Sequence, residues 1–105
     1  MVKRKSPYEQ ATDLAKTEQR TLMNKHEKFL ENLKRYAKTH QVLVNSALEL
    51  ESSIKDQEET LKSITRMREP KSDTKEIRKF KEQLVLIANS SRPLIQEIKD
   101  INNIN

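Results

Sequence analysis

The sequence contains no cysteine, no glycine and no tryptophan, and it has only two tyrosines and two phenylalanines. Without cysteine, the chain can form neither a disulfide framework nor a thiolate metal site. Without glycine, it lacks the residue on which tight hairpin turns and phosphate-binding loops depend. So few aromatic side chains leave no platform on which nucleic-acid bases would stack. These absences argue against sheets and predict an all-α fold.

Long apolar segments are also missing, because the longest uninterrupted runs are residues 42–44 and 84–88. A membrane-spanning helix needs about 20 apolar residues, so no transmembrane segment is predicted. The basic segment Met1–Lys5 leads into no apolar stretch, so we expect no secretory signal. A cytoplasmic location is therefore predicted. Nuclear import is an alternative, because Lys3–Lys5 directly precede Ser6 and Pro7.

Charge dominates the composition: 35% of the residues are charged and 33% are hydrophobic, so the chain cannot build a thick core. The net charge is +5, and a local basic excess lies between residues 62 and 81. Its members are Lys62, Arg66, Arg68, Lys71, Lys75, Arg78, Lys79 and Lys81. We expect these side chains to be the candidate contacts for an anionic membrane or another anionic partner.

The strongest positive feature is a seven-residue repeat of mainly apolar side chains, which runs from Tyr8 to Arg68 without a proline. Alternating steps of three and four residues place such side chains on one side of a helix, as in a coiled coil. A second run with the same spacing follows Pro70. The residues predicted to pack between helices are Leu22, Phe29, Leu33, Tyr36, Leu43, Leu50, Ile54, Leu61, Ile64, Ile77, Phe80, Leu84, Ile87, Leu94 and Ile98.

Capping signals set the ends of these helices. Ser6, Pro7 and Glu9 match a capping box at the start of the first helix, and Pro70 ends the repeat. Residues 1–6 are predicted to form a disordered leader and residues 103–105 a frayed tail, with a single helical domain over residues 7–102. Pro93 predicts a kink in the last helix.

Two arrangements of the helices remain open. In the first, the chain turns near residues 38–41 and forms an antiparallel three-helix bundle, with helices at about 7–38, 41–68 and 73–102. Matched segment lengths favour this bundle. In the second, residues 7–68 form one long helix that dimerises through an uncovered stripe, and residues 73–102 return along part of it. This alternative is favoured by the lack of Gly, Pro, Asn or Asp near Thr39.

Polar residues on the stripe carry two competing interpretations. Thr12, Gln19, Gln57 and Ser91 either fix the register or the number of packed helices or mark stretches that are only half buried. His26 and His40 lie too far apart on one helix to hold one ion together. No spacing of histidines and carboxylates matches a known catalytic motif. We therefore predict a non-enzymatic protein with no catalytic residues, no cofactor and no bound metal.

The leading functional hypothesis is a helical scaffold or adaptor. It would act through coiled-coil protein–protein interaction, as a homo-oligomer or as a subunit of a larger complex. An alternative is a peripheral membrane-binding helical protein that uses the basic residues 62–81. A weakly nucleic-acid-associated protein is a further alternative. Helix number and length resemble those of spectrin-type repeats, but the tryptophan usual in their first helix is absent and no family is recognised.

Overall fold

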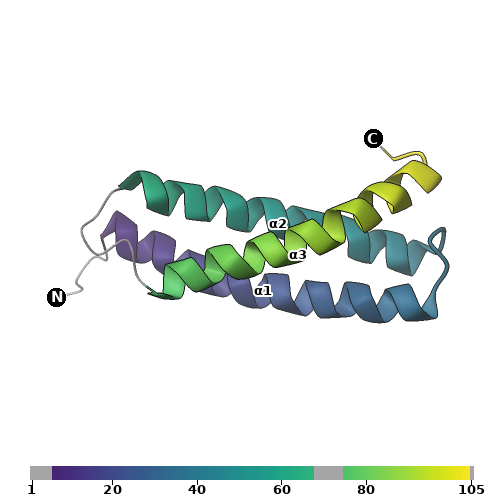
Figure 1. The fold of residues 1–105 in the computed structure, drawn as a ribbon, viewed down its shortest axis with the longest axis horizontal. Coiled ribbons are helices and arrows are strands. Elements are labelled where there is room, and N and C mark those ends of the chain that lie inside the picture. Colours follow the sequence, from purple (N-terminus) through teal and green to yellow (C-terminus); the bar gives the residue numbers. More distant parts are fainter. Residues whose placement is uncertain (1–5, 68–74, 105) are drawn as a thin grey trace.

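Three helices arranged up, down and up make the structure, a computed structural model that describes residues 6–67 and 75–104 (Figure 1). Helix α1 spans Pro7–Arg35, α2 spans Gln41–Met67 and α3 spans Lys75–Ile101. The principal extents are 52 × 28 × 23 Å. The predicted all-α three-helix bundle is confirmed. The alternative of one helix over residues 7–68 is wrong, because the helix ends at Arg35 and the chain reverses.

The turn between α1 and α2 spans Tyr36–His40, so α1 ends three residues before the predicted limit at residue 38. Tyr36 adopts an extended backbone, which ends α1. His40 then caps α2, because its Nδ1 accepts a hydrogen bond of 3.1 Å from the backbone N–H of Val42. The Tyr36 and His40 rings lie 4.4 Å apart. A histidine cap and a ring contact thus form a turn that has no Gly, Pro, Asn or Asp.

Side-chain and backbone caps also define the two outer ends. Ser6 Oγ accepts a hydrogen bond of 3.2 Å from the N–H of Glu9, and Pro7 occupies the first helical turn, as predicted. At the end of α3, Asn103 adopts the left-handed conformation with φ 56°. Its N–H donates to Asp100 O, and the Ile104 N–H donates to Lys99 O at 2.8 Å. These two bonds form a Schellman motif, in which asparagine takes the place usual for glycine. Fraying is predicted for residues 103–105; the structure shows Asn103 and Ile104 hydrogen-bonded to α3.

Helices α1 and α2 form a closely packed hairpin, with the most extensive backbone approach in the molecule. Small polar side chains explain this closeness, because Ser46, Ser53 and Thr60 of α2 recur every seven residues and are all buried. Asn32 of α1 donates a hydrogen bond to Ser46 Oγ, which in turn donates to Val42 O. Small residues at every seventh position allow the backbones to approach, and the Ser46 hydroxyl finds its acceptor along its own helix.

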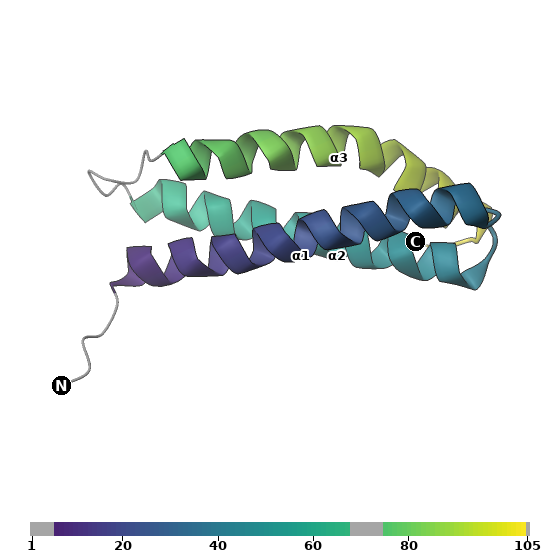
Figure 2. The same ribbon diagram turned by 90° about the horizontal axis from the view of Figure 1, so that it is seen from below.

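Helix α3 lies obliquely across this hairpin, and its C-terminal part bends toward the turn between α1 and α2 (Figures 1 and 2). It remains one helix through Pro93, which is exposed. The oblique path of α3 also determines which of its side chains are buried. Ile95, absent from the predicted packing set, is buried, whereas the predicted Leu94 is half-buried. Leu84, Ala88 and Ile95 recur at steps of four and seven, so a second apolar stripe reaches the core.

The core runs along the whole bundle and contains most of the residues predicted to pack. Buried members of that set are Leu22, Phe29, Leu43, Leu50, Ile54, Leu61, Ile64, Ile77, Leu84, Ile87 and Ile98. Half-buried members that pack against this core are Leu33, Tyr36, Phe80 and Leu94.

A layer of three glutamines, one from each helix, interrupts the core near its middle. Gln19 of α1 donates a hydrogen bond to Gln83 Oε1 of α3, and Gln57 of α2 donates to Gln19 Oε1 at 3.2 Å. Gln57 is fully buried and its Oε1 has no partner in the structure. Of the two interpretations of Gln19 and Gln57, burial and mutual bonding favour the one in which these residues fix the register.

Candidate interaction surface

The two ends of the bundle differ in how α3 is held. The turn pole comprises the Tyr36–His40 turn and residues 97–104. The groove pole comprises residues 58–66 of α2 and residues 75–86 of α3. Six of the eight basic side chains predicted as candidate contacts lie at the groove pole, and the other two, Arg68 and Lys71, lie outside the described residues.

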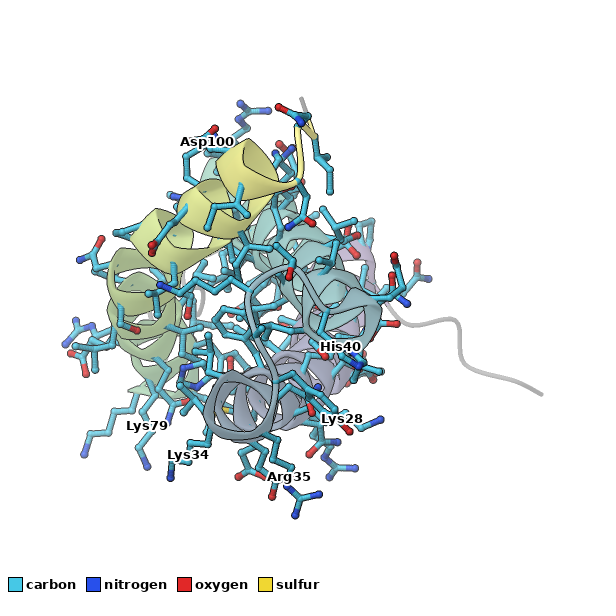
Figure 3. All side chains as sticks on the ribbon, turned by 90° about the vertical axis from the view of Figure 1, so that its right-hand side faces the viewer. Lys28, Lys34, Arg35, His40, Lys79 and Asp100 are labelled. Atoms are coloured by element: carbon cyan, nitrogen blue, oxygen red, sulfur yellow. The ribbon has the colours of Figure 1, made fainter. Side chains whose placement is uncertain are left out.

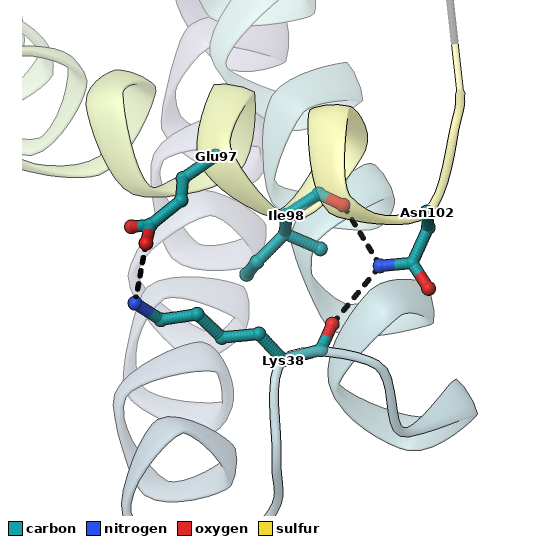
Figure 4. A network of polar contacts seen from close by, with 4 residues as sticks. All are labelled: Lys38, Glu97, Ile98 and Asn102. Atoms are coloured by element: carbon teal, nitrogen blue, oxygen red, sulfur yellow. Dashed lines mark hydrogen bonds and ion pairs between the residues drawn. The ribbon is translucent and has the colours of Figure 1, made fainter.

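Polar contacts close the turn pole (Figure 4). Lys38 Nζ lies 2.8 Å from Glu97 Oε1, and Asn102 Nδ2 donates to the backbone carbonyls of Lys38, at 3.0 Å, and Ile98, at 2.8 Å. Lys99 Nζ lies 3.2 Å from Glu51 Oε2, with both side chains largely buried. The turn and α2 are therefore both tied to the end of α3.

At the groove pole, α2 and α3 diverge, as Figure 1 shows. Between them lies an open groove of about 420 Å³. Leu61 and Leu84 form its apolar floor, and the two side chains are only 3% and 7% exposed. Val85 forms one wall and is 54% exposed. A recessed apolar floor with an exposed apolar wall is suited to accept an inserted side chain.

Basic residues form the rim of this groove. Lys62, Arg66 and Lys81 line it, and Lys81 Nζ donates to Thr65 Oγ1 at 2.8 Å. The acidic Glu58, which also lines the groove, is paired with Arg92. Within residues 6–67 and 75–104, the structure pairs neither Lys62 nor Arg66 with a carboxylate. The rim therefore presents net positive charge around an apolar centre.

The other predicted basic contacts are distributed differently. Lys75 and Lys79 are exposed and line a separate hollow of α3 beside Phe80. Figure 3 shows Lys79 pointing away from the bundle. Arg78 is exposed and makes an interaction of its own. Arg68 and Lys71 lie outside the described residues. The structure thus gathers three of the eight predicted basic residues, Lys62, Arg66 and Lys81, at one groove.

Large apolar side chains also remain uncovered on the outer surface of the bundle. Leu86 is 70% exposed and lies next to Val85, and a shallow hollow lined by both continues from the groove. Met23 and Leu30 of α1 are 37% and 42% exposed. Met23 and Leu30 lie on the same side of α1 as Gln19, and this side faces α3. Of the three helix pairs, α1 and α3 have backbones that approach each other least. Because α3 runs obliquely, neither the Val85–Leu86 pair of α3 nor the Met23–Leu30 pair of α1 is covered by another of the described helices.

The seam between α1 and α2 contains one perturbed carboxyl group. Burial raises the pKa of Glu18, a hydrogen bond with Thr60 opposes the rise, and the nearby charge of Asp56 adds to it. One oxygen of Glu18 is buried without a hydrogen-bond partner. In the part of the chain that the structure describes, no three His or carboxylate side chains gather as metal ligands would. Nor is any described helix long and apolar enough to cross a membrane.

Sequence reasoning missed several residues of this surface. Val85 and Leu86 belong to the apolar run 84–88 but fall off the seven-residue repeat, a combination that could have drawn attention to them although it does not by itself predict exposure, because Ala88 shares it and is buried. Gln83 was also missed, although it lies seven residues after Glu76, whose carboxylate pairs with Lys16 of α1 at 3.6 Å. That spacing places Gln83 on the flank that faces α1.

Comparison with known proteins adds no relative to this description. No protein-family model matches the chain, and neither the curated proteins nor the solved structures contain a match.

Proposed function

We propose that the protein is a non-enzymatic helical interaction module, which pairs an apolar helix face with a second copy or with another protein. The observation that carries the proposal is the exposure of Val85 and Leu86, at 54% and 70%, on a chain of which 35% is charged. Scattered single apolar residues are normal on protein surfaces, whereas adjacent ones that continue an apolar groove mark interaction sites.

The way the core is built supports the same proposal. A chain with 33% hydrophobic residues has few apolar side chains available, and most of its seven-residue repeat is buried within the bundle. Val85 and Leu86 nevertheless remain uncovered next to each other on α3. Covering them with a partner would remove apolar surface from water, at about 25 cal/mol per Å². A helix packed along this face is the simplest cover, because α3 presents Val85 and Leu86 on a regular helical surface.

The test is the double substitution Val85→Ser and Leu86→Ser in the full chain. We expect it to abolish self-association in sedimentation, or to remove specific proteins from those that co-purify with the wild type. A matched control, Leu14→Ser with Val42→Ser, changes two other exposed apolar residues, which are 52% and 41% exposed. The control should leave association unchanged. A wild-type chain that is monomeric, with a set of co-purifying proteins that neither variant alters, would contradict the proposal.

A further inference from the structure

The groove pole combines three properties that together specify the chemistry of a partner. It is recessed between two helices, its floor is apolar, and its rim is basic. We propose that this groove binds an acidic amphipathic helix of a partner protein, with apolar side chains inserted between α2 and α3 and carboxylates facing the rim. The inference rests on the proposed function and names the partner's chemistry.

Depth is the first argument for an inserted helix. Leu61 and Leu84 form the floor and are only 3% and 7% exposed, so only a side chain that enters the groove can contact them. The apolar surface then continues outward over Val85 to Leu86. Helix-in-groove recognition uses such a track, with anchors spaced at i, i+3 or i+4, and i+7 on the bound helix. A flat bilayer surface would touch Leu86 but would not reach the floor.

Charge is the second argument. Lys62 and Arg66 on α2 face the groove from one side, and Lys81 on α3 faces it from the other. Carboxylates that flank the apolar anchors of a bound helix would therefore meet cations along both edges. Glu58, the acidic residue of the lining, is already paired with Arg92, so the positive charges of the rim are in excess.

The same charges argue against a second copy of this chain in the groove. A symmetric contact between two grooves would place Lys62, Arg66 and Lys81 of both copies close together, and like charges oppose each other. Nucleic acid is disfavoured on different grounds. Base recognition on single strands uses aromatic stacking, and the groove lining contains no aromatic residue. The acidic helix is the occupant that fits both the floor and the rim.

The test uses a displayed library of helical peptides with fixed apolar anchors and randomised flanking residues, selected on the full chain. We expect the enriched peptides to carry Asp or Glu beside the anchors. Synthesised copies should bind at least tenfold more weakly to the charge-reversed variant Lys62→Glu with Lys81→Glu. The control Lys28→Glu with Lys34→Glu changes two exposed lysines of α1 and should bind as the wild type does.

Other outcomes overturn the inference in distinguishable ways. Enrichment of neutral or basic peptides, or no enrichment, contradicts an acidic partner. Binding that survives the groove variant but is lost on Met23→Ser with Leu30→Ser would place the partner on the α1 flank; the interaction module would stand and the groove inference would fail. Binding of the chain to vesicles with anionic lipid, lost in the groove variant, together with no peptide enrichment, would replace the helix by a membrane.

Discussion

The turn pole and the groove pole are built from the same three helices, yet only one is closed. At the turn pole, Lys38, Asn102 and Lys99 each connect α3 to the turn or to α2. At the groove pole, the Lys81–Thr65 hydrogen bond spans the opening between α2 and α3. A helix that crosses a hairpin obliquely can be held closely at one end while it diverges at the other. The difference shows how a small bundle keeps a stable core and still exposes a groove.

The largest difference between the poles should appear in the core. Ile98 at the turn pole is fully buried, whereas Leu84 at the groove pole lies on the floor of an open groove. We expect Ile98→Ala to lower the free energy of unfolding by about 4 kcal/mol and Leu84→Ala by about 2 kcal/mol, because an open site loses less packing. Denaturant unfolding followed by circular dichroism measures both. Equal losses would show that the groove pole is as closely packed as the turn pole.

A smaller effect of opposite sign is expected at the glutamine layer between the poles. Gln57 is fully buried with one oxygen unpartnered, and its one bond, to Gln19 Oε1, is long at 3.2 Å, so the desolvation cost that Gln57→Leu removes should exceed the hydrogen bond that it deletes. We expect the free energy of unfolding to rise by about 1 kcal/mol, with some loss of fixed register. Hydrogen exchange should slow at both poles alike. Destabilisation instead would mean that the Gln19 contact contributes more than the unpartnered oxygen costs.

Removing one side chain should loosen the turn pole. Asn102→Ala deletes two hydrogen bonds, to Lys38 O and Ile98 O, and we expect a loss of about 1 kcal/mol. Hydrogen exchange should accelerate at residues 102–104 and leave residues 75–86 unchanged. The control is Gln96→Ala, which removes one exposed bond to Asp100 and should change stability by less than about 0.5 kcal/mol.

Comparison of two lysines sharpens the contrast at the surface. Lys99 pairs with Glu51 where both side chains are largely buried, whereas Lys81 bonds Thr65 at an exposed site. We expect Lys99→Gln to cost about 1 kcal/mol, and Lys81→Gln to be neutral within about 0.5 kcal/mol. Thermal unfolding at low and high salt gives both values. If Lys81→Gln lowered stability as much as Lys99→Gln does, the groove pole would be held as firmly as the turn pole.

The smallest effect is a pH dependence away from both poles. The folded-state pKa of Glu18 is raised above its ordinary value of 4.5, mainly by burial, so the folded chain binds this proton more tightly than the unfolded chain does. The wild type should therefore lose stability as pH rises from 4.5 through the raised pKa. Glu18→Gln should remove this loss and be the more stable protein above that window. The exposed control Glu27→Gln should show the wild-type slope.

Local patterns in the sequence predicted the three helices and most of the core, because seven-residue spacing reports directly which side a helix buries. The position of the turn was harder to predict, since His40 acts as an N-cap in place of the usual Ser, Thr, Asp or Asn. The groove could not be predicted, because the direction of α3 depends on the sum of its contacts with two other helices. Ile95 illustrates this, as its burial follows from the path of α3 and not from the repeat.

The turn of five residues also has a kinetic consequence. Asn32 and Ser46 are 14 positions apart in the chain, whereas Gln19 and Gln83 are 64 apart. Closing a short loop costs less chain entropy and happens sooner, so we expect the contacts between consecutive helices to form first. Thr65 and Lys81 at the groove pole are only 16 positions apart, whereas Lys38 and Asn102 at the turn pole are 64 apart, so the turn pole should be the last to close on folding. Once the bundle is folded, residues 58–66 and 75–86 should still be the first to separate in native-state fluctuations, because an open groove lies between them, and this would admit a partner without unfolding the rest.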